Sequence, residues 1–147
     1  MDEQDLLARN RIYWRFVELG RAPRLAEIAD ELELSLDEAE AVLRRLHDAH
    51  ALVLERGAPK IRMANPFSAV PTGYRVEAAG RSWFASCAWD AFGIPAALGV
   101  DGHISCACPD CVEPIQIDVR DRRPVPDEQV VHLLVPAARW WDDIVFT

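Results

Sequence analysis

Apolar positions recur with a helical spacing in the first third of the chain. Residues 5–20 carry such a stripe, and residues 24–32 form a second, shorter amphipathic stretch. Ser35 is placed to cap the next segment, and Glu38 lies three residues later, which completes a capping box. The pattern therefore predicts three successive helices, the third over residues 36–49.

Beyond the third helix the spacing changes to short runs that are typical of strands. Residues 52–57 and 60–63 predict a hairpin with a glycine-containing turn, and residues 74–78 and 81–84 predict a second one. Further strands are expected around Ile104 and over residues 115–119 and 130–135, the last of these being the final clear strand.

Two further helical segments are expected in the second half. The first covers residues 86–92 and ends near Gly93, with Pro95 opening a turn. The second begins at Pro136 and contains Trp140. The tryptophans of this half are expected to be core anchors rather than a ligand cage, namely Trp83, Trp89, Trp140 and Trp141.

Helix, helix, helix, hairpin is the order of a winged helix-turn-helix unit. We therefore predict an α+β fold with a winged helix-like module over residues 1–64 and a mixed or antiparallel sheet with a packed helix over residues 65–147. Such a module either binds DNA or serves only for packing. The third helix opens with Asp37, Glu38 and Glu40, where a DNA reader would place basic or amide side chains, which favours packing.

Composition and charge narrow the classes of function. Half of the 147 residues are hydrophobic, which predicts a packed globular protein, and the formal net charge is −8. Residues 1–65 carry 10 basic and 13 acidic residues and the remainder 6 and 11, so nucleic acid is not expected as a partner. No apolar run is long enough to span a membrane, and the acidic N-terminus lacks a signal core, so we expect a cytoplasmic protein.

The first candidate site is the pair Cys87 and Asp90. The two residues stand three apart in a predicted helix and would share one face. A thiol beside a carboxylate combines a ligand for soft metals with a proton carrier. The alternative is structural, with Cys87 as a small buried hydrophobe and Asp90 as a surface charge.

The second candidate site is the cluster Cys106, Cys108 and Cys111. Cys108 and Cys111 form a C-x2-C knuckle between two predicted strands, a pattern typical of half a zinc site. His103 or Cys106 would have to complete it. Zinc and mercury are the candidate ions for this cluster, and the alternative is a set of thiols without metal.

One segment of the chain resembles a known family. Phe84–Pro95, with Cys87 followed three residues later by Asp90 among aromatic residues, is similar to the active-site segment of the organomercurial (alkylmercury) lyases. Residues 108–115 resemble the next motif of that family, and residues 65–68 and the helical N-terminal module also fit.

The resemblance implies protonolysis of a carbon–mercury bond in a small organomercurial. Cys87 would bind mercury as thiolate, Asp90 would manage the proton, and no cofactor would be required. The helical module would be structural. The family also uses a second catalytic cysteine after a segment similar to residues 141–147. This sequence contains no cysteine after Cys111, so we expect protonolysis to be impaired.

Two other classes of function fit the same sequence. The first is a metal- or redox-responsive winged-helix regulator that senses through Cys106, Cys108 and Cys111. The second is a structural or interaction protein that contains a zinc knuckle. The sequence does not set the oligomeric state.

Overall fold

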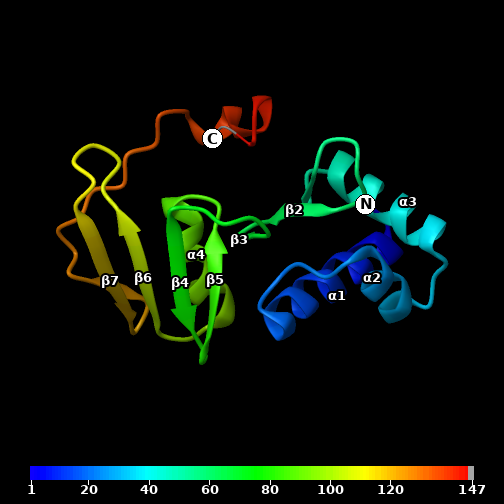
Figure 1. Cartoon of the computed structure of the whole chain (residues 1–147), viewed down its shortest axis with the longest axis horizontal. Coiled ribbons are helices and arrows are strands. Elements are labelled where there is room, and N and C mark those ends of the chain that lie inside the picture. Colours follow the sequence, from blue (N-terminus) through cyan, green and yellow to red (C-terminus); the bar gives the residue numbers. More distant parts are fainter. Residues whose placement is uncertain (146–147) are drawn as a thin grey trace.

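The computed structural model describes residues 1–145 and combines helices with one antiparallel sheet (Figure 1). The helices are α1 (Glu3–Leu19), α2 (Leu25–Leu32), α3 (Leu36–Asp48) and α4 (Ala88–Leu98), followed by the 3-10 helix η1 (Ala137–Asp142). The strands are β1 (Val53–Leu54), β2 (Ile61–Ala64), β3 (Phe67–Ser68), β4 (Tyr74–Ala78), β5 (Arg81–Ala85), β6 (Gly102–Ala107), β7 (Pro114–Arg120) and β8 (Arg123–Val125). They are ordered β1-β2-β3-β5-β4-β6-β7-β8. The predicted α+β class with a packed helix is confirmed.

Local signals set the N-terminal helices. The Asp2 side chain caps α1 by accepting from the backbone N–H of Asp5 at 2.8 Å. At α3 the predicted capping box is present, because Ser35 accepts from the Glu38 N–H at 3.3 Å and the Glu38 carboxylate accepts from the Ser35 N–H at 2.9 Å. These caps satisfy backbone donors that have no partner inside a helix.

The sheet continues from the first half of the chain into the second. Strand β2 pairs with β3 through the partners Met63 with Ser68 and Ala64 with Phe67, and β3 then pairs with β5. The division at residue 64 and the winged-helix character of the first part therefore stay predictions. In the structure both parts share one sheet.

An aromatic cluster joins α1 to this sheet. The Phe16 and Phe67 rings stack with centroids 5.3 Å apart, and the Phe67 and Trp83 rings lie 5.7 Å apart. The indole N–H of Trp83 donates to the carbonyl of Phe16 at 3.3 Å. Because all three side chains are buried, this cluster fixes where α1 lies against the sheet.

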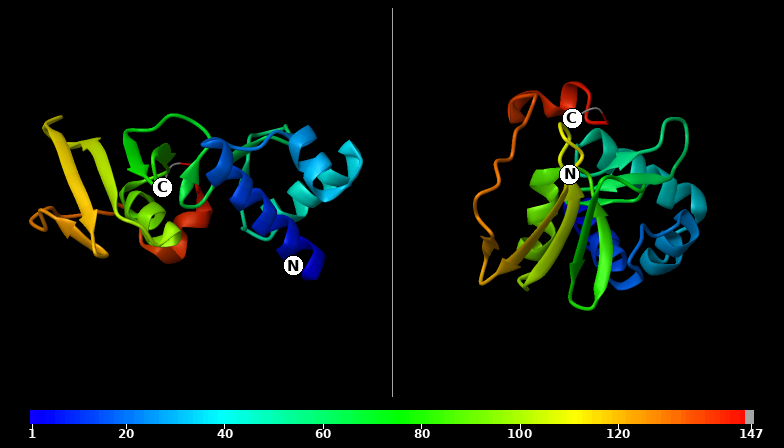
Figure 2. Two further views of the ribbon diagram at one scale, coloured as in Figure 1. Left: turned by 90° about the horizontal axis from the view of Figure 1, so that it is seen from below. Right: turned by 60° about the vertical axis from the view of Figure 1, so that its left-hand side comes forward.

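Helix α4 is longer than the sequence predicts. It continues past Gly93 and contains Pro95, so the predicted turn at Pro95 is wrong. The helix packs on β4, β5 and β6, and the burial of Ile94 and Pro95 offsets the hydrogen bond that proline removes (Figure 2). A Cβ at position 93 would lie 3.1 Å from Cβ of Pro66, so glycine allows the loop before β3 to approach the helix.

The predicted strand at residues 130–135 is not formed. This segment is irregular and runs from β8 towards η1 (Figure 1), and Val130 and Leu134 are 90% and 80% exposed. Strand β8, which the sequence analysis missed, pairs with β7 instead. An apolar run forms a strand only where a neighbouring strand offers backbone hydrogen-bond partners. The spacing of apolar residues does not show whether such a neighbour exists. The helical segment expected after Pro136 is present as η1.

Within residues 1–145, no helix is both long and apolar enough to cross a membrane.

We expect Phe67→Ala to lower the free energy of unfolding by about 3–5 kcal/mol, because it empties the space between Phe16 and Trp83. Urea denaturation followed by tryptophan fluorescence measures this loss. The matched control is Phe84→Ala on β5, where the side chain is only partly buried and a smaller loss is expected. Equal losses in the two variants would contradict the central position of Phe67.

Candidate active site

Cys87 lies at the junction of β5 and α4. It is the N-cap residue of α4, with an extended backbone (φ −155°), rather than a residue inside the helix as predicted. Its side chain makes no capping hydrogen bond. The backbone N–H groups of Asp90 and Trp89 nevertheless act to lower the pKa of its thiol. An N-cap residue stands at the end of a helix where unpaired N–H groups favour negative charge.

Asp90 is buried in the first turn of the same helix, with only 6% of its surface exposed. One carboxylate oxygen accepts from the side-chain N–H of Asn65 at 3.0 Å, and the adjacent Cys87 side chain acts to lower the pKa of the same carboxyl group. The alternative of Asp90 as a surface charge is therefore wrong. The structure brings Cys87 and Asp90 together, as the spacing predicts.

Burial dominates the proton affinities of this pair. It raises the pKa of the Cys87 thiol above its ordinary 9.0, and the N–H groups of Asp90 and Trp89 oppose this effect. Burial also raises the pKa of the Asp90 carboxyl above 3.8, against the hydrogen bonds from Cys87 and Asn65. Near neutral pH the resting site therefore holds a thiol beside a carboxyl group whose proton affinity is increased.

Two cavities adjoin the pair. One of about 250 Å³ is lined by Cys87, Ser86 and Tyr74, and one of about 540 Å³ is lined by Asp90 and Asn65, with Trp140 in the wall of both. The Ser86 hydroxyl is buried and has no hydrogen-bond partner among residues 1–145. A small molecule could therefore reach the thiol from one side and the carboxyl group from the other.

The tryptophans of this region divide between core and cavity walls. Trp83 is buried, which agrees with the expectation of a core anchor. Trp89 is 62% exposed and Trp141 is 37% exposed, so the same expectation is wrong for these two. Both line the Asp90 cavity, and Trp141 stacks on His50 with centroids 4.1 Å apart.

Tyr74 is a site residue that the sequence reasoning missed. It lines the Cys87 cavity and also a neighbouring apolar cavity of about 300 Å³ that contains Cys106 and Cys108. Burial raises the pKa of the Tyr74 hydroxyl, and the charges of Cys106 and Cys87 add to the effect. The pairing of Tyr74 with Ala85 across the hairpin could have revealed it, since Ala85 stands two residues before Cys87.

The three cysteines of the second candidate site occupy different environments. Cys106 is partly buried on β6, and burial raises the pKa of its thiol. Cys108 and Cys111 lie in the turn between β6 and β7, where the N–H groups of Cys111 and Asp110 lower the pKa of Cys108. Among residues 1–145, no group of three or more His, Cys, Asp or Glu side chains is arranged to hold a metal ion. Zinc at this cluster stays an untested prediction.

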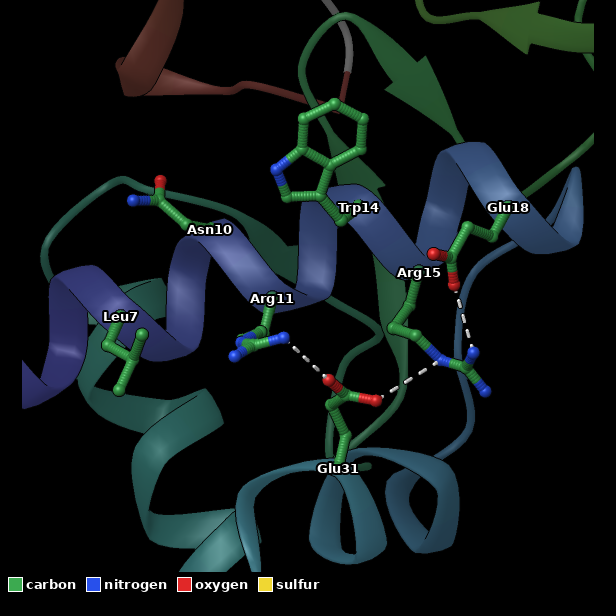
Figure 3. Close-up of a pocket in the computed structure, with 7 residues that line it drawn as sticks. All are labelled: Leu7, Asn10, Arg11, Trp14, Arg15, Glu18 and Glu31. Atoms are coloured by element: carbon green, nitrogen blue, oxygen red, sulfur yellow. Dashed lines mark hydrogen bonds and ion pairs between the residues drawn. The ribbon is translucent and has the colours of Figure 1, made fainter.

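Another hollow, of about 470 Å³, lies elsewhere, between α1 and α2 (Figure 3). Its polar side chains form ion pairs, in which Glu31 contacts Arg11 at 3.3 Å and Arg15 at 3.8 Å. Arg15 also contacts Glu18 at 3.0 Å. The two pairs of Glu31 connect the helices, but such partly exposed pairs contribute little stability. The described residues that line the hollow include no thiol.

We expect iodoacetamide to alkylate Cys108 faster than Cys87 between pH 7 and pH 9. The thiolate is the reactive form, and its population is increased at Cys108 and decreased at Cys87. Peptide mass spectrometry over a time course measures the two rates. The urea-unfolded chain is the control, because unfolding removes the difference in environment. Faster labelling of Cys87 in the folded chain would contradict these environments.

Asp90→Asn should remove the pH dependence of stability that this carboxyl group causes. Because the pKa is raised in the folded state, the contribution of Asp90 to stability is fully present below pH 3.8 and is lost as pH rises through the folded-state pKa. The free energy of unfolding of the unsubstituted chain, compared with that of Asp90→Asn, should therefore fall as the pH rises from 3.8 through the folded-state pKa. Urea denaturation at several pH values measures it, and a relative stability that rises with pH would show that the sign is wrong.

Comparisons with known proteins agree with this geometry. A sequence model of the alkylmercury lyase family matches residues 67–147, more than half of the chain. The solved structure described as the mercury-bound form of MerB2 matches with a TM-score of 0.65 and 25% identity. The match covers 86% of this chain and 62% of that one, so this chain spans less than two thirds of its relative. A comparison with curated proteins found no match. The resemblance seen in the sequence is thus confirmed, and this chain belongs to the alkylmercury lyase family.

Proposed function

We propose that this chain binds a small organomercurial through Cys87 and protonolyses its carbon–mercury bond with Asp90 as the proton carrier. The observation that carries the proposal is the contact between the Cys87 thiol and the buried Asp90 carboxyl group at the start of α4. Membership of the alkylmercury lyase family and the similarity to a mercury-bound structure support it.

The first step is capture of the metal. The Cys87 sulfur forms a bond to mercury, the ligand that mercury carried in solution (water, halide or a thiolate) leaves, and the Cys87 proton moves to the adjacent Asp90. A soft thiolate suits a soft metal ion. The N–H groups of Trp89 and Asp90 stabilise negative charge on sulfur while the proton leaves.

The second step transfers that proton to carbon. The carbon–mercury bond breaks, a carbon–hydrogen bond forms with the proton held by Asp90, and the hydrocarbon leaves. Mercury(II) stays on the Cys87 sulfur. The raised pKa of Asp90 favours this role, because a carboxyl group with an ordinary pKa would release the proton to water near neutral pH.

The family mechanism implied by the resemblance also uses a second thiolate, which weakens the carbon–mercury bond. In the family that cysteine follows a segment similar to residues 141–147, of which residues 146–147 lie outside the described residues. A small thiol added to the reaction supplies this ligand in the experiment below. The proposal assigns only Cys87 and Asp90, and it requires no cofactor.

A single-turnover assay tests the two roles. With phenylmercury and excess free cysteine we expect benzene release from the unsubstituted chain, none above the rate without protein from Cys87→Ser, and release at least about a hundredfold slower from Asp90→Asn. Gas chromatography measures benzene, and native mass spectrometry measures bound phenylmercury. Asp90→Asn should still bind phenylmercury, because it keeps the Cys87 sulfur.

The control variant is Asp127→Asn, which removes an exposed carboxylate after β8 and should leave the rate unchanged. Benzene release by Asp90→Asn at the unsubstituted rate would show that Asp90 does not carry the proton. Tight phenylmercury binding at Cys87→Ser with unchanged turnover would show that Cys87 is not the mercury ligand.

A further inference from the structure

The turn between β6 and β7 is held in shape by its own backbone. The N–H of Cys108 donates to the carbonyl of Glu113 at 2.9 Å, and the N–H of Val112 donates to the carbonyl of Cys108 at 3.0 Å. Val112 takes a left-handed conformation (φ 63°), which closes the turn. The two thiols of the turn take no part in these backbone bonds, so they are not needed to form it.

The same turn places two sulfurs side by side. The closed turn holds Cys108 and Cys111 three residues apart, and the neighbouring N–H groups and the Cys111 thiol lower the pKa of Cys108. Cys111 is exposed, so the pair is accessible from solvent. The result is a pair of thiols that one closed turn presents together to solvent.

The number of donors limits which ion this dithiol could hold. Tetrahedral zinc sites use four protein ligands, or three and a water molecule. Over residues 1–145, no third His, Cys, Asp or Glu joins Cys108 and Cys111 in a metal-binding group. Two thiolates are a complete set only for a soft ion that accepts two ligands, and the net charge of −8 favours cations in general.

The dithiol also lies near the catalytic pair. Cys108 lines the apolar cavity of about 300 Å³, and Tyr74, Ala88 and His132 form walls of both this cavity and the one at Cys87. We propose that the Cys108–Cys111 dithiol is a second mercury site, which takes up the inorganic mercury(II) that protonolysis leaves on Cys87. The direction of transfer rests on the proposed function, whereas the site itself does not.

The transfer is an exchange of thiolates and needs no oxidant or reductant. Two sulfur–mercury bonds form, to Cys108 and Cys111, and the Cys87 sulfur–mercury bond and the bond to the small thiol break. The two protons that leave Cys108 and Cys111 end on Cys87 and on the departing thiol. Mercury stays in the +2 state, and Cys87 is again a free thiol for the next substrate.

Binding of mercury(II) alone tests the site without any protonolysis. In reduced Cys87→Ser protein we expect one mercury(II) per chain to resist a fixed excess of glutathione. Adding Cys108→Ser or Cys111→Ser should weaken the apparent affinity by at least about a hundredfold, since a lone thiol loses the effective concentration of its neighbour. Ultraviolet sulfur–mercury absorption and native mass spectrometry measure the complex.

The matched control is Cys106→Ser in the Cys87→Ser protein, which removes the other thiol that lines the same cavity as Cys108 and should leave the affinity unchanged. Equal mercury(II) affinity with and without Cys108 would overturn the site. If Cys106→Ser lost as much affinity as Cys108→Ser, the assignment of the site to two ligands would be wrong. Mercury(II) binding without benzene release from phenylmercury would contradict the proposed function and leave the dithiol site intact.

Discussion

The buried carboxyl group of Asp90 is the constraint on which the site depends. A carboxylate out of water is costly unless hydrogen-bond donors surround it, and here the donors come from two distant parts of the chain. Asn65 precedes β3, and Cys87 follows β5. The pairing of β3 with β5 brings these segments together, and Gly93 lets Pro66 approach α4 closely enough for Asn65 to reach the carboxyl group.

The N-terminal helices contribute to the same site. Tyr13 of α1 lines the Asp90 cavity, and its hydroxyl donates to the carbonyl of Ala51 at 3.1 Å. Burial raises the pKa of this hydroxyl, and the charge of Asp90 adds to the shift. The buried contacts of Phe16 with Phe67 and Trp83 hold α1 in this position. A supporting role for these helices is consistent with the acidic start of α3, which does not suit contact with DNA.

The cysteines differ in the protonation state that their surroundings favour. Cys87 is partly buried beside a carboxyl group, and burial raises the pKa of its thiol. Cys108 lies in a turn where the N–H groups of Cys111 and Asp110 lower the pKa of its thiol. One chain therefore holds a thiol with a raised pKa and, in a separate turn, a thiol with a lowered pKa, and the cavities beside them share Tyr74.

The sequence by itself determined the features that depend on neighbours along the chain. The three N-terminal helices, the Ser35 capping box, the hairpin of β4 and β5 and the spacing of Cys87 and Asp90 are all local, and each is present. The predicted strand over residues 130–135 is not formed, and the predicted turn at Pro95 lies inside α4. Both predictions were wrong because strand pairing and helix burial depend on distant partners. The roles of Asn65 and Tyr74 were invisible for the same reason. Only the tertiary structure places an amide from before β3 against Asp90 and a phenol from β4 between two cavities, since sheet order, unlike periodicity, is set by the packing of the whole chain.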